Sequence, residues 1–96
     1  MKTQIMFTPD TRALHELGAN WENIVFDIHE FLLEKGFEYD RTLGYIREGE
    51  TDEDEMRDIC GEIIELGLGT DYFIALHASI IDNVTDLTYL FRDNDE

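Results

Sequence analysis

The first residues of the chain follow a two-residue apolar period. Thr3, Ile5 and Phe7 fall on one face of this pattern, which is typical of a strand with one covered face. Pro9 ends the predicted strand because proline cannot donate to a strand ladder. Residues 8–19 then connect to the next element, with a short helical turn around Ala13, Leu14 and Leu17.

The clearest pattern is a helical stripe that follows Asn20. Apolar residues recur there at spacings of three and four, at Trp21, Ile24, Val25, Ile28, Phe31 and Leu32. Asn20 can cap the start of this helix. Lys35 lies in the last turn, where the helix dipole favours a cation, and Gly36 supplies a left-handed stop. We expect Trp21 to pack with the stripe.

Two short strands and a turn are predicted next. Phe37 and Tyr39 alternate with acidic residues, and Leu43–Arg47 gives a third strand. Residues 40–42 are few enough for a hairpin turn between them. Gly44 would weaken a strand interior, so we expect a bulge or a close backbone approach there.

The second half of the chain predicts a helix, a strand and a short closing helix. Thr51 is expected to cap the helix, whose buried stripe is Met56, Ile59, Cys60, Ile63 and Leu66, and which ends at Gly67 and Gly69. In residues 72–81, apolar residues occur at both odd and even positions, so both faces of a strand would be apolar. That pattern indicates a strand covered on both faces, or one whose second face meets another chain. The closing helix would use Val84, Leu87, Leu90 and Phe91.

This order of elements predicts the fold class. A β-α-β-β-α-β sequence in 96 residues indicates one α+β domain, residues 1–96, of the ferredoxin-like type. An antiparallel sheet would carry two helices on one face and a short C-terminal helix. A domain this small buries a modest fraction of its surface, so we expect a homodimer or another partner.

The cellular setting follows from what the chain lacks. There is one cysteine, so no disulfide forms within the chain, which suits a reducing compartment. The N-terminal apolar run is too short for a signal peptide, and no stretch approaches the length of a membrane span. A cytoplasmic location and no membrane contact are therefore expected.

The net charge of the chain restricts its possible functions more than any other feature of the sequence. Twenty-three acids against seven bases give a formal charge of −16, and no Lys/Arg cluster exists that could bind phosphates. Direct binding of nucleic acid is therefore not expected. Three explanations stay open: a surface that imitates nucleic acid and occupies a basic groove on another protein, a surface adapted to high salt, or an ordinary acidic surface that maintains solubility.

The acids best suited to contact a basic groove lie in two places. The polar face of the first long helix carries Glu22, Asp27, Glu30 and Glu34, and the central loop carries Glu48, Glu50, Asp52, Glu53, Asp54 and Glu55. The run from Asp52 to Glu55 also has a sufficient structural explanation, since the dipole favours anions in the first turn of a helix.

Several short pieces, in order, resemble the virulence-associated protein D family, which is related to the small CRISPR adaptation nuclease. They are Phe7 at the end of the first strand, Asp27-Ile28 with Leu32, Gly36-Phe37, Tyr45, Tyr72-Phe73 and Thr85-Asp86-Leu87-Thr88. The resemblance covers residues 3–91. It implies a ferredoxin-like fold, a dimer and, in some members, ribonuclease activity within a toxin–antitoxin system.

The chain departs from the family pattern where that activity would lie. The resemblance implies an aspartate directly after the first-strand phenylalanine, and this chain has Thr8 there, with Asp10 two residues further on. The basic stretch near the fourth strand is replaced by Ala75-Leu76-His77-Ala78.

Few residues offer other chemistry. If the chain is a ribonuclease, its catalytic residues are Asp10, His15 and Tyr45. We expect His29 on the surface, His77 in the core or an interface, and Cys60 as a buried filler. No zinc, calcium or phosphate-loop spacing is present, so no metal or cofactor is expected.

The sequence favours a non-catalytic acidic interaction protein. It would block a basic nucleic-acid-binding surface on another protein, such as a nuclease or a defence complex, as an inhibitor or an antitoxin. The alternatives are an endoribonuclease of a toxin–antitoxin system and a structural homodimer with a halophilic surface.

Overall fold

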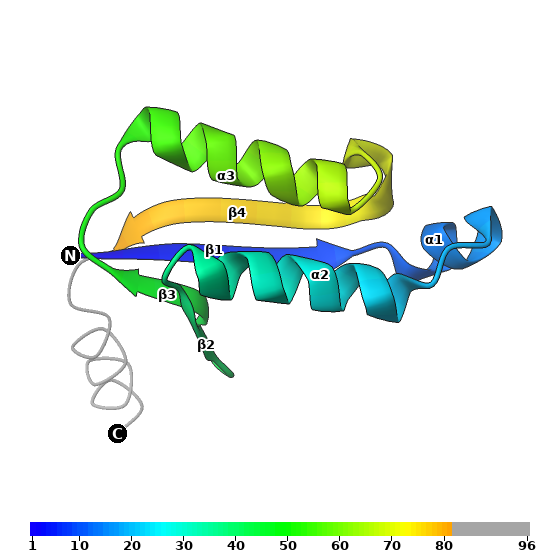
Figure 1. Cartoon of the computed structure of the whole chain (residues 1–96), viewed down its shortest axis with the longest axis horizontal. Helices are drawn as coiled ribbons and strands as arrows, with labels where there is room; N and C mark the ends of the chain where they lie inside the picture. The colour runs from blue at the N-terminus through cyan, green and yellow to red at the C-terminus, as the bar shows by residue number, and fades with distance from the viewer. Residues whose placement is uncertain (82–96) are drawn as a thin grey trace, which may run out of the picture.

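The long helices and the strands follow one another along the chain in the predicted β-α-β-β-α-β order (Figure 1). The computed structural model describes residues 1–81. Its elements are β1 (Lys2–Pro9), α1 (Thr11–Leu17), α2 (Trp21–Glu34), β2 (Glu38–Asp40), β3 (Gly44–Glu48), α3 (Glu53–Leu66), the 3-10 turn η1 (Thr70–Tyr72) and β4 (Phe73–Ile81). The helix expected around Val84, Leu87, Leu90 and Phe91 lies outside the described residues.

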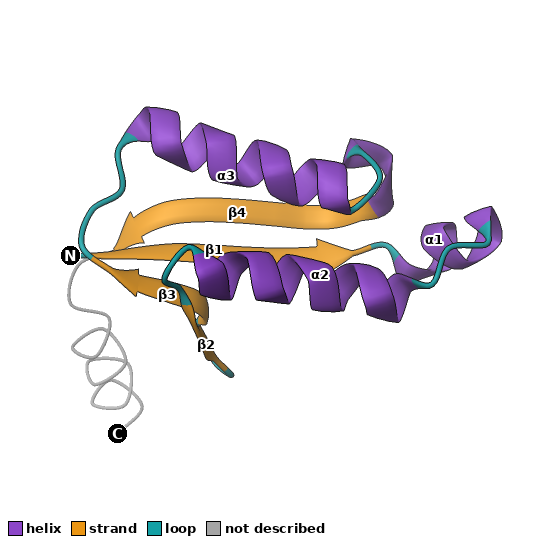
Figure 2. Cartoon of the chain, viewed as in Figure 1, coloured by secondary structure: helices purple, strands orange, loops and turns teal. Residues whose placement is uncertain are grey.

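The strands form one antiparallel sheet in the order β2-β3-β1-β4. Each long helix connects two strands that flank a third: α2 leads from β1 to β2 with β3 between them, and α3 leads from β3 to β4 with β1 between them. This is the split β-α-β arrangement of the ferredoxin-like fold. The predicted fold class is confirmed, and Figure 2 shows the two long helices along the strands.

The hydrophobic core lies between one face of the sheet and both long helices. Ile5 of β1 is completely buried among Ile28 and Leu32 of α2 and Ile59 and Ile63 of α3. Residues from both helices pack on this same strand position, so both helices cover the same sheet face. The apolar stripes predicted for the two helices are confirmed at these positions.

The connection between β1 and α2 is more ordered than the sequence suggested. A seven-residue helix, α1, replaces the expected single turn. The Oδ1 atom of Asp10 accepts a hydrogen bond of 3.0 Å from the backbone N–H of Ala13 and so caps its start. Gly18 ends it with a φ of 87°, a left-handed conformation that glycine adopts without strain.

The start of α3 differs from the prediction. Thr51 does not cap this helix; the cap is Asp52, whose Oδ1 accepts a 2.8 Å hydrogen bond from the N–H of Glu55. The Thr51 hydroxyl is instead buried against Thr3 and receives a hydrogen bond from the Arg47 guanidinium. These partners hold Thr51 away from the helix end, so the next residue performs the capping.

Three local predictions are confirmed. Asn20 caps α2 by accepting hydrogen bonds from the N–H groups of Glu22 and Asn23, and Gly36 has a φ of 91°. Gly44 has a φ of 85°, and a Cβ atom on it would lie 2.9 Å from the Ile5 carbonyl oxygen. At Gly44 the hairpin therefore lies so close to β1 that a side chain would not fit.

The other sheet face carries no helix within residues 1–81. On β4, its side chains alternate with those that face the core, and they include His77 and Ser79, which are exposed. The prediction that His77 belongs to the core is wrong, while an interface role stays a prediction. None of the helices in residues 1–81 combines the length and the apolar character that crossing a bilayer requires.

Candidate functional site

The acids of α2 form an exposed row on the side of the helix opposite the core. Glu22, Asp27, Glu30 and Glu34 are all exposed. Within residues 1–81, none of these four carboxylates lies within 4.0 Å of a basic group. Four predicted partner-contacting acids are therefore accessible and uncompensated in the part of the chain that the structure describes.

Helix α3 adds a second acidic row that the sequence analysis only partly anticipated. Its first turn carries the predicted Glu53, Asp54 and Glu55. Three further exposed acids, Asp58, Glu62 and Glu65, continue along the helix. The signal for them was available, since each lies between the apolar positions of the α3 stripe and so faces away from the core.

The predicted acids of the central loop are partly engaged within the protein. Glu48 pairs with Lys2 at 3.5 Å, Glu55 pairs with Arg47 at 3.2 Å, and Asp52 caps α3.

The other two predicted acids in the first turn of α3 pair with the same arginine. Glu53 and Asp54 pair with Arg57 at 3.3 and 3.5 Å. Glu50 is exposed in the loop before the helix. The α2 row therefore carries more uncompensated charge than the loop.

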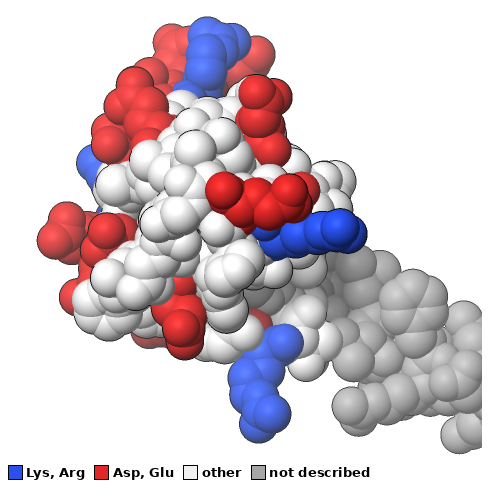
Figure 3. Space-filling view, turned by 90° about the vertical axis from the view of Figure 1, so that its right-hand side faces the viewer, with Lys and Arg blue, Asp and Glu red and all other residues white. Residues whose placement is uncertain are grey.

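Acidic side chains are also visible at the end of the molecule that carries α1 (Figure 3). In this view, Asp and Glu atoms lie around the margins and right of the centre, uncharged residues fill much of the rest, and Lys and Arg atoms form a few separate patches. Within α2 and α3, Arg57 is the single lysine or arginine. The helical layer is therefore anionic over both of its helices.

The predicted ribonuclease residues occupy different places. The Asp10 carboxylate caps α1, and His15 is exposed on α1. Tyr45 lies on β3, 7% exposed, and its hydroxyl is 2.8 Å from Nδ1 of His29. The structure therefore joins Tyr45 to His29, which is half-buried and not the free surface residue we expected, and not to Asp10 or His15.

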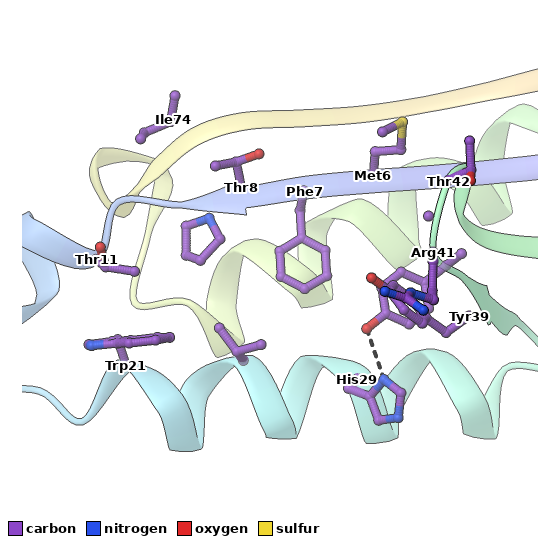
Figure 4. A pocket seen from close by; sticks show the side chains of 14 residues that line it. Met6, Phe7, Thr8, Thr11, Trp21, His29, Tyr39, Arg41, Thr42 and Ile74 are labelled. Carbon is purple, nitrogen blue, oxygen red and sulfur yellow. Dashed lines mark hydrogen bonds between the residues drawn. The ribbon is translucent and has the colours of Figure 1, made fainter.

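Tyr45 lines an open cavity of about 770 Å³. β3 pairs with β1 only from Lys2 to Ile5, so residues 6–9 of β1 have no strand on this side within the described chain. The cavity occupies this place, between β1, α2 and the hairpin turn (Figure 4). Asp10 and His15 are not among the residues that line it.

Aromatic rings dominate one part of the cavity wall. Tyr39 and Tyr45 are cross-strand partners with ring centroids 5.1 Å apart, and Phe7 stacks on Tyr45 at 5.8 Å. Burial raises the pKa of the Tyr45 phenol above its ordinary value, and the neighbouring Tyr39 adds to the rise. Tyr45 is therefore a neutral hydrogen-bonding group at physiological pH.

The hairpin turn places a basic side chain, Arg41, at this cavity. Oδ1 of Asp40 accepts hydrogen bonds from the N–H groups of Leu43 and Thr42, at 2.9 and 2.8 Å, and these bonds lower the pKa of the Asp40 carboxyl. The carboxylate thereby fixes the turn that contains Arg41, the one charged residue among the described residues that line the cavity.

The described residues contain no metal centre. Within residues 1–81, no three His, Cys, Asp or Glu side chains are grouped so that they could hold an ion. Cys60 is half-buried, and burial raises the pKa of its thiol. The thiol is therefore held in its protonated form, which neither binds metals well nor attacks substrates.

Fold and surface together define a small α+β domain with an anionic helical layer and an aromatic cavity. Comparisons with protein-family models, curated proteins and solved structures gave no match to this chain. The resemblance to the virulence-associated protein D family therefore stays a prediction.

Proposed function

We propose that this protein acts in the cytoplasm by binding a basic surface of another protein through the acidic layer of α2 and α3. The partner would be a protein with a nucleic-acid groove, such as a nuclease or a defence complex. The observation on which this proposal mainly rests is the row of four exposed acids on α2 that have no basic neighbour among the described residues.

The density of charge supports imitation of a nucleic acid. Each helix has 14 residues and is therefore about 21 Å long. Four exposed acids on α2 and six on α3, offset by Arg57, leave about one net negative charge for every 2.3 Å along this layer, while duplex DNA carries one for about every 1.7 Å. A groove that neutralises phosphates would meet a comparable charge here.

The energetics of α2 favour the same interpretation. Asp27, Glu30 and Glu34 lie three and four residues apart on one helix, and like charges at these spacings destabilise a helix by about 0.2–0.5 kcal/mol per pair. Within residues 1–81 no basic side chain compensates this repulsion. Contact with a cationic partner would remove the repulsion.

The experiment has two stages. The purified chain is first used to capture proteins from a host lysate at low salt, with identification by mass spectrometry. The captured protein is then bound to labelled duplex DNA, and fluorescence anisotropy follows the release of DNA as the chain is added. We expect release at low salt that weakens as salt rises, because surface charges are screened within about 10 Å at 0.1 M.

A matched pair of variants separates this surface from net charge alone. One variant carries Asp27→Asn, Glu30→Gln and Glu34→Gln on α2. The control carries Glu16→Gln, Glu38→Gln and Asp71→Asn, which removes the same charge at exposed sites outside this layer. We expect only the α2 variant to lose competition with DNA. Equal behaviour of the two variants, or competition that is unchanged at high salt, contradicts the proposal.

The same purified chain tests the two alternative functions, an endoribonuclease and a halophilic homodimer. Cleavage of RNA that is lost in Asp10→Ala would instead support the ribonuclease. A steep rise of stability with salt, in a chain that captures no partner, would support the halophilic homodimer. Dimerisation stays a prediction that sedimentation of the purified chain checks.

A further inference from the structure

We propose that the cavity between α2 and residues 6–9 of β1 binds a small aromatic carboxylate, meaning a planar aromatic ring with one carboxylate group. This site is separate from the acidic layer, since α2 contributes its acids to the layer and a different side, which includes Trp21 and His29, to the cavity. The inference therefore does not depend on the proposed function.

The size of the cavity suits a small molecule. Its volume of about 770 Å³ lies within the range of about 300–1,000 Å³ that is typical of small-molecule pockets, which are mostly apolar with a few convergent polar groups. The lining has this composition, with apolar and aromatic side chains and a small number of polar ones.

Aromatic side chains form much of the wall and favour a flat ring. Figure 4 shows Trp21 at one end, Phe7 in the middle, and Tyr39 with His29 at the other end. Trp21 is 38% exposed and Tyr39 is 56% exposed, so both rings have free surface. Offset-stacked and edge-to-face contacts with such rings contribute about 0.5–1.5 kcal/mol each beyond burial.

The charge pattern of the lining favours an anionic group. Residues 1–81 contain 18 acids, yet none of these is among the described residues that line this cavity, and Arg41 is the charged residue in that lining. Arg41 makes no ion pair or hydrogen bond within residues 1–81. A guanidinium is suited to a carboxylate because it can donate two parallel hydrogen bonds.

The overall charge limits the ligand to a single negative charge. The body of the protein carries −16, and this field opposes the approach of polyanions more than that of monoanions. Polyphosphates and nucleic acids are therefore disfavoured at a site with one cation. The His29–Tyr45 pair, with 2.8 Å between Nδ1 and the hydroxyl oxygen, adds polar atoms that can bind a ring substituent.

Trp21 makes the proposal directly testable, because it is the only tryptophan in the chain. The full chain, labelled with ¹⁵N, is titrated with 2-naphthoate, and NMR follows the single indole N–H signal. We expect this signal to move and to saturate. Two related probes are titrated in parallel: 2-naphthalenemethanol, which has the ring without the charge, and cyclohexanecarboxylate, which has the charge without an aromatic ring.

Two arginine variants test the charged contact. Arg41→Gln should weaken binding of 2-naphthoate by about tenfold or more, since a hydrogen bond to a charged group contributes about 1.5–3 kcal/mol, and should leave 2-naphthalenemethanol binding unchanged. The control Arg12→Gln removes the same charge from an exposed site on α1 outside the cavity lining, and should bind 2-naphthoate as the unaltered chain does.

Three results would overturn the proposal. One is an indole signal that does not move at millimolar 2-naphthoate. Another is equal weakening by Arg12→Gln and Arg41→Gln, which would mean that only long-range charge matters. The third is cyclohexanecarboxylate binding as tightly as 2-naphthoate, which would exclude recognition of the aromatic ring.

Discussion

The hydroxyl oxygens of Thr3 and Thr51 lie 2.6 Å apart, and both residues are buried. Thr3 donates its proton to the Gly49 carbonyl oxygen at 2.9 Å, so Thr51 must be the donor between the two hydroxyls. Thr3 also accepts a hydrogen bond of 3.1 Å from the N–H of Thr51. One side chain of β1 therefore fixes the loop that leads from β3 into α3.

Loss of this buried hydroxyl should destabilise the fold. Thr3→Val keeps the side-chain shape but leaves the Gly49 carbonyl and the Thr51 N–H without their partner, so we expect the free energy of unfolding to fall by about 2–4 kcal/mol. Thr3→Ser keeps the hydroxyl and loses one methyl group, at a cost of about 1 kcal/mol. Urea unfolding of both variants measures the difference, and equal losses would show that the hydroxyl contributes nothing.

Two glycines with similar backbone angles should respond differently to alanine. Gly49 has a φ of 91° and open space at the Cβ position, whereas at Gly44 the Cβ would lie 2.9 Å from the Ile5 carbonyl oxygen. Gly49→Ala should therefore cost about 1 kcal/mol of stability from the left-handed conformation alone, and Gly44→Ala clearly more. Thermal unfolding of the pair checks this order. A reversed order would contradict the close approach of the hairpin to β1.

Neutralising one acid on α2 should stabilise the protein. Glu30 lies three residues after Asp27 and four before Glu34, so Glu30→Gln removes two like-charge pairs and should raise the free energy of unfolding by about 0.4–1 kcal/mol at low salt. The control Glu53→Gln loses an ion pair with Arg57 and should lower it slightly. Both effects should vanish near 1 M salt, where the screening length is about 3 Å.

The hydroxyl of Tyr45 should make stability depend on alkaline pH. Burial raises the pKa of this phenol in the folded state, so the unfolded chain loses the proton first, at about pH 10. The resulting stabilisation is intact below that pH and is lost as the pH rises through the folded-state pKa. Urea unfolding at pH 9 and 10.5 should therefore show a larger fall for the unaltered chain than for Tyr45→Phe. Parallel decreases would contradict it.

Local patterns predicted much of the frame because they are decided by near neighbours. The stripe of α2 identified Ile28 and Leu32, both fully buried, and Asn20 caps this helix as expected. In each case the relevant spacing or hydrogen bond involves residues only a few positions apart. The same reasoning failed at Thr51, where Thr3, 48 positions away, binds the hydroxyl and leaves the cap to Asp52.

The cavity could not be predicted for the same reason. Its walls combine β1, α2, the hairpin turn and the start of β4, and its space exists because β3 stops pairing with β1 at Ile5. Strand register of this kind is a tertiary property. The hairpin was predicted with its turn at residues 40–42, but β2 ends at Asp40 and β3 begins at Gly44. Only this shifted register places Tyr39 opposite Tyr45 and brings the two aromatic rings together.

The sheet order also constrains how the protein is made. β1 is synthesised before the other three strands but lies between β3 and β4, and its partners on the β4 side extend to Ile81. The hydrogen bonds between β1 and β4 can therefore form only after almost the whole described chain has left the ribosome. Pairings of such long sequence separation form slowly, and until they form the nascent chain exposes the unpaired backbone N–H and C=O groups of this strand edge, which invite aggregation or chaperone binding.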